Sequence, residues 1–89
     1  MAVLMTAEGS GQILAGYSDL FDVVSSELRS AQGFLMHASH PVDGGWRVLE
    51  IWDSRQDAAA VFATTIAPHL PERVRPKLNF TRLHDVVQP

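Results

Sequence analysis

The chain has 89 residues and a formal net charge of -3 at pH 7, which indicates a single domain over residues 1–89. It contains no cysteine, so disulfides, thiolate nucleophiles and cysteine-based metal sites are excluded. The acidic balance argues against a nucleic-acid partner. No apolar run approaches the length of a membrane span, so we expect a cytoplasmic protein that does not enter a membrane.

The first third of the chain predicts a strand followed by an amphipathic helix. Residues 2–6 have the composition of a short strand, and Gly9 and Gly11 are expected to break it, with Ser10 as a candidate N-cap. From residue 12 to 29 the apolar side chains recur every three or four positions, which is the period of one helix face. These side chains are Leu14, Tyr17, Phe21, Val24 and Leu28.

The rest of the chain predicts a hairpin, a second helix and a last strand. Residues 33–42 and 46–53 flank an Asp-Gly pair, which is a strong signal for a β-hairpin. Ser54 followed by Asp57 resembles a capping box that opens a helix. The apolar face of that helix comprises Ala58, Val61, Phe62, Thr65 and Ile66. Residues 77–87 complete the pattern as a strand.

The order β-α-β-β-α-β predicts an α+β fold of the ferredoxin-like type, a four-stranded antiparallel sheet with both helices on one face. On the second strand the apolar set is Phe34, Met36 and Ala38, which we expect under the helices. On the third strand the aliphatic pair Leu49 and Ile51 is expected there too. The side chains that alternate with this pair then lie on the open face, namely Trp46, Val48, Glu50 and Trp52.

Two tryptophans on an uncovered face are costly, because burying one large aromatic stabilises a fold by roughly 1.5–3 kcal/mol. Soluble monomers rarely expose a contiguous apolar patch of this kind. We therefore expect a homodimer formed through the open sheet face, with the second copy as its cover.

The segment VLEIWDSRQDAAAVF, which runs from the third strand into the second helix, resembles the dimeric α+β barrel superfamily. It is most similar to the antibiotic-biosynthesis-monooxygenase-like branch, in which an E-x-W-[DE]-[SD] segment stands at this place. The resemblance implies two protomers that pack their open sheet faces into a barrel whose interior holds a small hydrophobic ligand. On that basis Trp46, Glu50 and Trp52 line the barrel interior.

The same resemblance argues against haem as the substrate. The haem-degrading branch uses an asparagine on the first strand and a histidine within the second helix. Residues 2–6 contain no asparagine and residues 57–66 contain no histidine. His69 resembles a histidine near the end of that helix in the broader family, where its role varies.

His37 and Glu50 are the candidate catalytic residues. An imidazole suits proton transfer at neutral pH, and a carboxylate among apolar residues is costly unless it is paired or protonated. His37 also has a structural interpretation, as a histidine bonded across the dimer interface, and Glu50 as an ion pair with Arg82. A metal shared by His37 and His40 is not expected, because these positions of a strand face opposite sides.

The remaining candidates are substrate-binding side chains: Trp46, Trp52, Leu35, Phe80, Arg82 and His84. For the last strand the pattern leaves both faces open. One face carries Leu78, Phe80, Arg82, His84 and Val86, which resembles a pocket lining, and the other carries Asn79, Thr81, Leu83, Asp85 and Val87.

These patterns support three functions. The first is a cofactor-independent enzyme of secondary metabolism that removes a proton from an aromatic or polyketide-like compound, leading to oxygenation, isomerisation or cyclisation. The second is a non-catalytic module or accessory subunit that binds a small ligand. The third, an RNA-recognition-type domain, needs aromatic and basic residues on the sheet, and the acidic charge disfavours it. No phosphate loop, flavin or nicotinamide fingerprint is present in the sequence, so no cofactor is expected.

Overall fold

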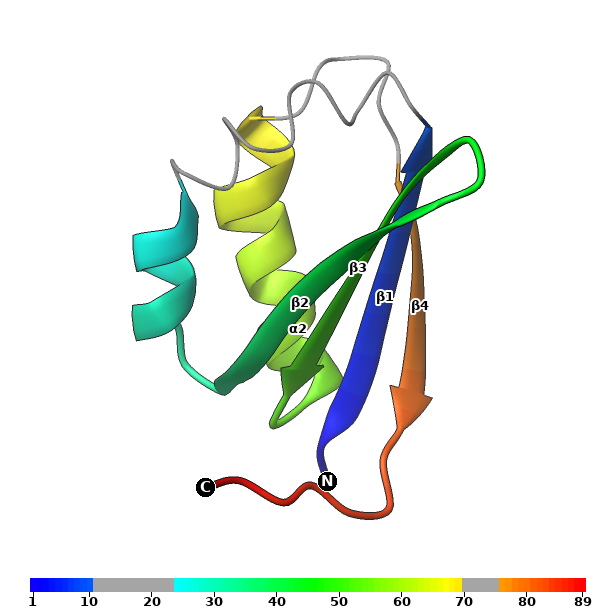
Figure 1. The fold of residues 1–89 in the computed structure, drawn as a ribbon. Helices are drawn as coiled ribbons and strands as arrows, with labels where there is room; N and C mark the ends of the chain where they lie inside the picture. Colours follow the sequence, from blue (N-terminus) through cyan, green and yellow to red (C-terminus); the bar gives the residue numbers. More distant parts are fainter. Residues whose placement is uncertain (11–23, 70–75) are drawn as a thin grey trace.

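The computed structural model describes residues 1–10, 24–69 and 76–89. Within these ranges four strands form one antiparallel sheet in the order β2-β3-β1-β4, and the helical segments lie on one side of it (Figure 1). The strands are β1 (Val3–Ser10), β2 (Phe34–Val42), β3 (Gly45–Trp52) and β4 (Lys77–Arg82). This arrangement confirms the predicted ferredoxin-like α+β fold.

Two helical segments pack against the sheet. Residues 24–30 are helical and correspond to the last part of the predicted first helix, whose earlier residues lie outside the described ranges. The second segment begins with α2 (Arg55–Val61), continues as the π-helix η1 (Phe62–Ile66) and ends as the 3-10 turn η2 (Ala67–His69). No helix in the described ranges is long and apolar enough to cross a membrane.

Strand β1 is longer than the sequence predicts, because it continues through Gly9 to Ser10. Gly9 lies directly opposite Trp46 of β3. A glycine inside a strand commonly marks a place where a large neighbouring group comes close, and the eight-residue partner strand supplies ladder hydrogen bonds beyond the predicted break. Ser10 is therefore a strand residue in its backbone conformation.

Strand β4 is shorter than predicted and ends at Arg82. Among the described strands it pairs only with β1, and its last partner is Val3, the first residue of that strand. One further backbone bond, from the amide of Leu83 to the carbonyl of Ala2 at 2.9 Å, closes the ladder. His84 and the residues after it consequently lie beyond the sheet.

The predicted hairpin and helix cap are both present. Asp43 and Gly44 connect β2 to β3, and Gly44 adopts a φ of 75°, which a glycine reaches without strain. Ser54 caps α2 by accepting a hydrogen bond at Oγ from the amide of Asp57, at 3.1 Å. The local signals of the chain therefore fixed both turns correctly.

The predicted sidedness of the sheet is wrong. Trp52 is only 1% exposed and belongs to one buried cluster with Val24 and Leu28 of the first helical segment and Ala58 of α2. Side chains that alternate with Trp52 along β3, namely Trp46, Val48 and Glu50, share its helix-facing side. Leu49 and Ile51 consequently lie on the open face.

A β-bulge explains part of this error. The register of β2 against β3 shifts between Phe34, which pairs with Trp52, and Met36, which pairs with Ile51. Phe34 therefore shares the helix side with His37, whereas Met36 lies on the open face and is 45% exposed. Leu35 is the extra residue of the bulge, which breaks the alternation that the prediction assumed.

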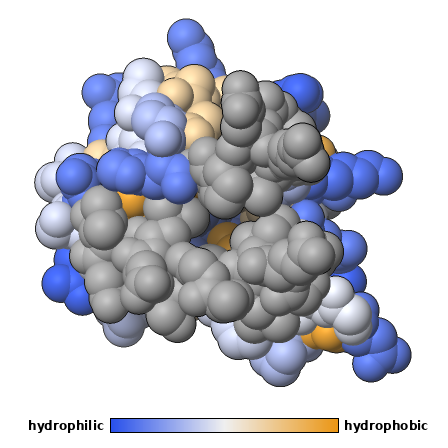
Figure 2. All heavy atoms as spheres, turned by 90° about the horizontal axis from the view of Figure 1, so that it is seen from above, coloured by the Kyte–Doolittle hydropathy of each residue, from blue (hydrophilic) through white to orange (hydrophobic). Residues whose placement is uncertain are grey.

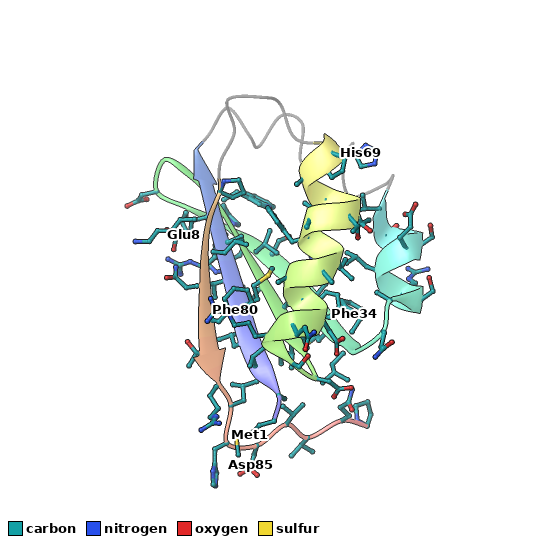
Figure 3. The ribbon with its side chains drawn as sticks, turned by 180° about the vertical axis from the view of Figure 1, so that it is seen from behind. Met1, Glu8, Phe34, His69, Phe80 and Asp85 are labelled. Carbon is teal, nitrogen blue, oxygen red and sulfur yellow. The ribbon has the colours of Figure 1, made fainter. Side chains whose placement is uncertain are left out.

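The helix side of the sheet is built from cross-strand rows, since directly paired residues project to the same face. From the chain termini towards the hairpin, these rows are Phe34, Trp52, Val3 and Arg82; then His37, Glu50, Met5 and Phe80; then Ser39, Val48, Ala7 and Leu78. Apart from the exposed Arg82, the first two rows pack under the helices, and Figure 3 shows Phe80 between the sheet and α2. In the view from above, hydrophilic residues lie at several places around the rim, with paler and hydrophobic residues between them (Figure 2).

Gly33 joins the first helical segment to β2 at a φ of 82°, and a Cβ at this position would collide with the carboxylate of Asp57. We expect Gly33→Ala to lower the free energy of unfolding by more than the roughly 1–2 kcal/mol of left-handed backbone strain alone. Gly44→Ala is the matched control, because it has a similar φ and no atom within 4 Å of the added Cβ. Equal losses for the two variants in urea unfolding would contradict the role of Asp57.

Candidate functional site

The candidate site is centred on Glu50, a carboxylate buried between the sheet and the helices. The residue is 6% exposed, the only buried charged residue in the described ranges. Its Oε2 lies 2.7 Å from Nδ1 of His37, and its Oε1 accepts a hydrogen bond of 3.0 Å from Nε1 of Trp52. Each carboxylate oxygen therefore has a nitrogen partner, which is the condition under which a carboxylate tolerates burial.

The backbone aligns these three side chains. Glu50 and Trp52 are two residues apart on β3, so they share a face, and His37 lies directly opposite Glu50 on β2. The bulge after Phe34 brings His37 to the helix side. The side chain of His37 is 13% exposed, and that of Glu50 is 7% exposed.

Trp52 is held firmly in this arrangement. Its ring packs edge-on against Phe34, with centroids 5.4 Å apart and planes at 73°. Edge-to-face pairs of this kind add stabilisation beyond the buried area. The indole is therefore a packing element and a hydrogen-bond donor at the same time.

The structure brings together His37, Glu50 and Trp52, as the sequence predicts, but it places them under the helices and not on the open face. Trp46 is on the same side, nearer the hairpin, opposite Gly9 and Pro41. Phe80 is on this side too, in the row of Glu50, and the guanidinium of Arg55 lies 4.8 Å from the centre of its ring.

Two predicted site residues are not brought to this group. Arg82 is exposed at the end of β4, and the partner of Glu50 is His37. The side chain of His84 is 97% exposed and lies 3.8 Å from the carboxylate of Asp85. Leu35 is half-buried in the bulge. The open question about β4 is resolved by its register with β1, which puts Leu78 and Phe80 on the helix side.

His37 and His40 lie on opposite faces of β2, as predicted. His37 pairs with the buried Glu50, and His40 is exposed opposite Arg47, with its Nδ1 2.9 Å from the carbonyl oxygen of Pro41. No group of three or more potential metal-ligating side chains occurs among the described residues. Strand β1 contains no asparagine, and His69, exposed at the end of η2, is the only histidine in α2, η1 and η2.

The hydrogen bond within the E-x-W segment is the part of the site that the sequence analysis missed. Glutamate and tryptophan at positions i and i+2 of a strand share a face, and indole nitrogen is a donor that a carboxylate can accept. The spacing alone was a usable signal. An ion pair with Arg82 was one of the two predicted roles of Glu50, and the tryptophans were expected to act only through their aromatic surfaces.

No family model matches the chain, and no curated protein matches it. Several solved structures share its fold. A conserved protein from Methanosarcina mazei has a TM-score of 0.72 at 15% identity, over 92% of both chains. SnoaB, a cofactor-independent oxygenase from Streptomyces nogalater, has a TM-score of 0.69 at 12% identity, over 99% of this chain and 97% of that chain.

A third similar structure is that of MhuD, a heme-degrader from Mycobacterium tuberculosis with two hemes bound in its active site. It has a TM-score of 0.65 at 17% identity, over 99% of this chain and 100% of that chain. The chain has the fold of these proteins. The likeness confirms the α+β fold that the sequence predicts.

Removing the carboxylate of Glu50 leaves two buried nitrogen groups without their acceptor. We expect Glu50→Ala to lower the free energy of unfolding by about 3–5 kcal/mol, the cost typical of breaking a buried pair. Glu8→Ala is the control, because its partner Arg47 lies 2.6 Å away in a pair whose side chains are 51% and 39% exposed. That loss should be about 0–1 kcal/mol. Urea unfolding at one protein concentration compares them, and similar losses would argue against a structural role for Glu50.

Proposed function

We propose that the chain is a cofactor-independent enzyme that removes a proton from a small, flat, hydrophobic compound of the aromatic or polyketide-like class. The observation that carries this proposal is the buried contact of 2.7 Å between His37 and Glu50. A histidine oriented by a carboxylate is a recurring general base, because the carboxylate fixes the ring and stabilises the imidazolium that forms.

In the proposed step, His37 is the catalytic base and Glu50 is a positioning residue. An ionised Glu50 accepts a hydrogen bond from Nδ1–H of His37, so the proton stays on Nδ1 and the lone pair of the neutral ring is on Nε2. Nε2 takes a proton from a carbon beside a carbonyl group, and the electrons of the broken C–H bond move onto the carbonyl oxygen as an enolate. The enolate then reacts with molecular oxygen, rearranges or closes a ring, according to the substrate.

The side chains around this group favour a hydrophobic ligand. Beyond the row of Glu50, towards the hairpin, the helix side of the sheet carries first Ser39, Val48, Ala7 and Leu78, and then Trp46 opposite Gly9 and Pro41. Ser39, Ala7 and Gly9 are smaller than the side chains in the rows of Trp52 and Glu50. We infer that the ligand lies over them, against the indole of Trp46, with its acidic carbon towards His37.

The likeness to SnoaB, described as a cofactor-independent oxygenase, supports chemistry without a metal or flavin. The likeness to MhuD supports a flat hydrophobic ligand in this fold. The alternative is a non-catalytic protein that holds such a ligand. The two functions differ in one measurable event, which is the breaking of a C–H bond.

Deuterium exchange in D2O tests for that event and does not depend on what the enolate does next. We expect the protein, without added metal, flavin or haem, to accelerate exchange of the C1 protons of 2-tetralone or its larger fused-ring analogues. His37→Ala should lower the accelerated rate by roughly 10²–10⁴-fold, the usual contribution of a general base. The measurement is the loss of the C1 proton signal in NMR spectra.

His40→Ala is the control, because His40 is exposed on the opposite face of β2. Saturation-transfer NMR of the same mixtures reports binding independently. Binding without accelerated exchange would favour the non-catalytic alternative. Exchange that needs an added metal, flavin or haem would contradict the hypothesis of a cofactor-independent enzyme. Full activity in His37→Ala would remove His37 from the mechanism.

We further propose that a second copy of the chain covers the open face of the sheet. Near the chain termini that face carries an apolar patch, because Leu4, Ile51 and Met36 lie side by side in a row that ends at Thr81, and Leu49 lies in the next row. It becomes charged towards the hairpin, where Glu8 pairs with Arg47. An apolar patch within a polar rim is the anatomy of a protein interface.

Substituting Leu49 tests this dimer. We expect light scattering to give the natural protein twice the 9.8 kDa mass of one chain. Leu49→Asp should shift the measured mass towards that of one chain and lower the melting temperature. The reason is that each copy would bury one unpaired carboxylate in the interface. Ala59→Asp adds the same charge on the exposed side of α2 and should leave the mass unchanged. A monomeric natural chain would contradict the proposal.

A further inference from the structure

We propose that two copies of the chain pair with each strand parallel to its own copy, so that Arg47 faces the partner's Glu8 and Glu8 faces the partner's Arg47. The inference rests on the proposed homodimer, and it adds the orientation of the copies and the contacts that select a second copy as the partner. It follows from the distribution of charge over the open face of the sheet.

The strands carry all the charged and titratable side chains of the open face in one cross-strand row. This row lies nearest the hairpin and consists of His40, Arg47, Glu8 and Lys77. The two rows nearer the chain termini are uncharged: Ala38, Leu49, Thr6 and Asn79, then Met36, Ile51, Leu4 and Thr81. Any orientation that does not bring the charged row onto itself would set charges against uncharged side chains, which is costly on burial, or leave the row outside the interface.

The strand order makes the charged row complementary to a second copy of itself. Strands β3 and β1 are the inner strands, and β2 and β4 are the edges (Figure 1). A two-fold axis that is parallel to the strands and midway between β3 and β1 keeps row on row and reverses the order of the strands. Strand β3 then lies over the partner's β1, which sets Arg47 against the partner's Glu8 twice in the dimer. The ends of the row, His40 and Lys77, lie at the edges, where two twisted sheets diverge.

The opposite orientation gives no such match. Sheets that pack face to face commonly keep their strand directions within about 30° of each other, so the axis can also run across the strands. Each strand would then lie over its own copy in the reverse direction, and the charged row would meet the row of Leu4 and Ile51. Leu4 is the second residue of β1, so moving the axis to that row would leave most of each face uncovered.

The pair of Glu8 and Arg47 keeps polar groups available for the partner. Nε and Nη2 of Arg47 lie 2.7 and 2.6 Å from the same oxygen, Oε1 of Glu8. These two contacts use neither Oε2 of Glu8 nor Nη1 of Arg47. A guanidinium has five N–H donors and a carboxylate has two acceptor oxygens, so two such pairs can join into one network across the interface. The side chains are 39% and 51% exposed, which leaves them accessible to the partner.

The experiment exchanges the two charges between separate chains. Glu8→Arg makes this pair of positions positive and Arg47→Glu makes it negative. We expect each variant alone to dimerise at least about tenfold more weakly than the natural chain, because like charges face each other. In a 1:1 mixture each positive side chain faces a negative one of the partner, so the mixed dimer should form at least about tenfold more tightly than either variant alone. Sedimentation velocity measures the dissociation constants, and native mass spectrometry identifies the mixed dimer.

The mixture isolates the contacts between copies. Within each variant chain positions 8 and 47 carry like charges, so contacts inside one chain cannot restore the dimer. Each substitution changes the net charge of -3 by two units, to -1 or to -5, so both chains remain negative and their overall charges do not attract. Gln56→Arg and Gln56→Glu are the matched controls, because they place the same charges on an exposed residue of α2. Each of these controls alone should dimerise as the natural chain does.

Cross-linking tests the orientation with the natural charges in place and covers charge variants that do not fold. The chain contains no cysteine, so Met36→Cys and Thr81→Cys each supply a single thiol. In the proposed orientation Met36 lies over the partner's Thr81, and a bismaleimide that spans about 10 Å, the usual spacing of packed sheets, should join the two variants. Met36→Cys should not be joined to itself, because three strand spacings, about 14 Å, separate the two thiols sideways.

A mixture of charge variants that dimerises no better than its components would overturn the orientation, even if the natural chain is a dimer. Single charge variants as dimeric as the natural chain would do the same, as would Met36→Cys that cross-links to itself and not to Thr81→Cys. A monomeric natural chain would overturn this proposal together with the proposed dimer, whereas the deuterium-exchange assay decides separately on the enzyme. A mixed dimer that forms at low salt and weakens at high salt, with the Met36–Thr81 cross-link, would support the proposal.

Discussion

The burial of the Glu50 carboxylate is the constraint on which the rest of the site depends. A carboxylate beneath two helices is stable only when its oxygens have hydrogen-bond donors, and here the donors come from two strands. This requirement fixes the register of β2 against β3 at His37 and the orientation of the indole two residues along β3. The buried carboxylate therefore links the packing of Trp52 in the core to the position of His37.

The two faces of the sheet carry different sets of side chains. The helix side holds the tryptophans, the buried carboxylate and His37, whereas the open side holds an apolar row and the exposed pair of Glu8 and Arg47. A site beneath the helices belongs to one copy of the chain. A homodimer through the open face would then contain two such sites and would not need to build one between the copies.

The likeness to solved structures supports the fold and leaves the chemistry to the residues. One similar structure is of a cofactor-independent oxygenase and another is of a heme-degrader, at 12% and 17% identity. One backbone arrangement thus carries different reactions, which is usual for a small α+β fold. In this chain the proposed chemistry rests on His37, Glu50 and Trp52, which hydrogen bonds join into one group.

The sequence by itself determined the element order, the hairpin at Asp43 and Gly44, and the cap at Ser54, because each depends on residues close together in the chain. It also determined that Glu50 and Trp52 share a face, which is a property of any strand. Only the tertiary structure decided which face that is. Both faces of this sheet carry apolar residues, so the alternation along the strands did not show which face the helices cover. The bulge after Phe34 also brings His37 to the helix side, and it depends on a pairing between strands that no local pattern encodes.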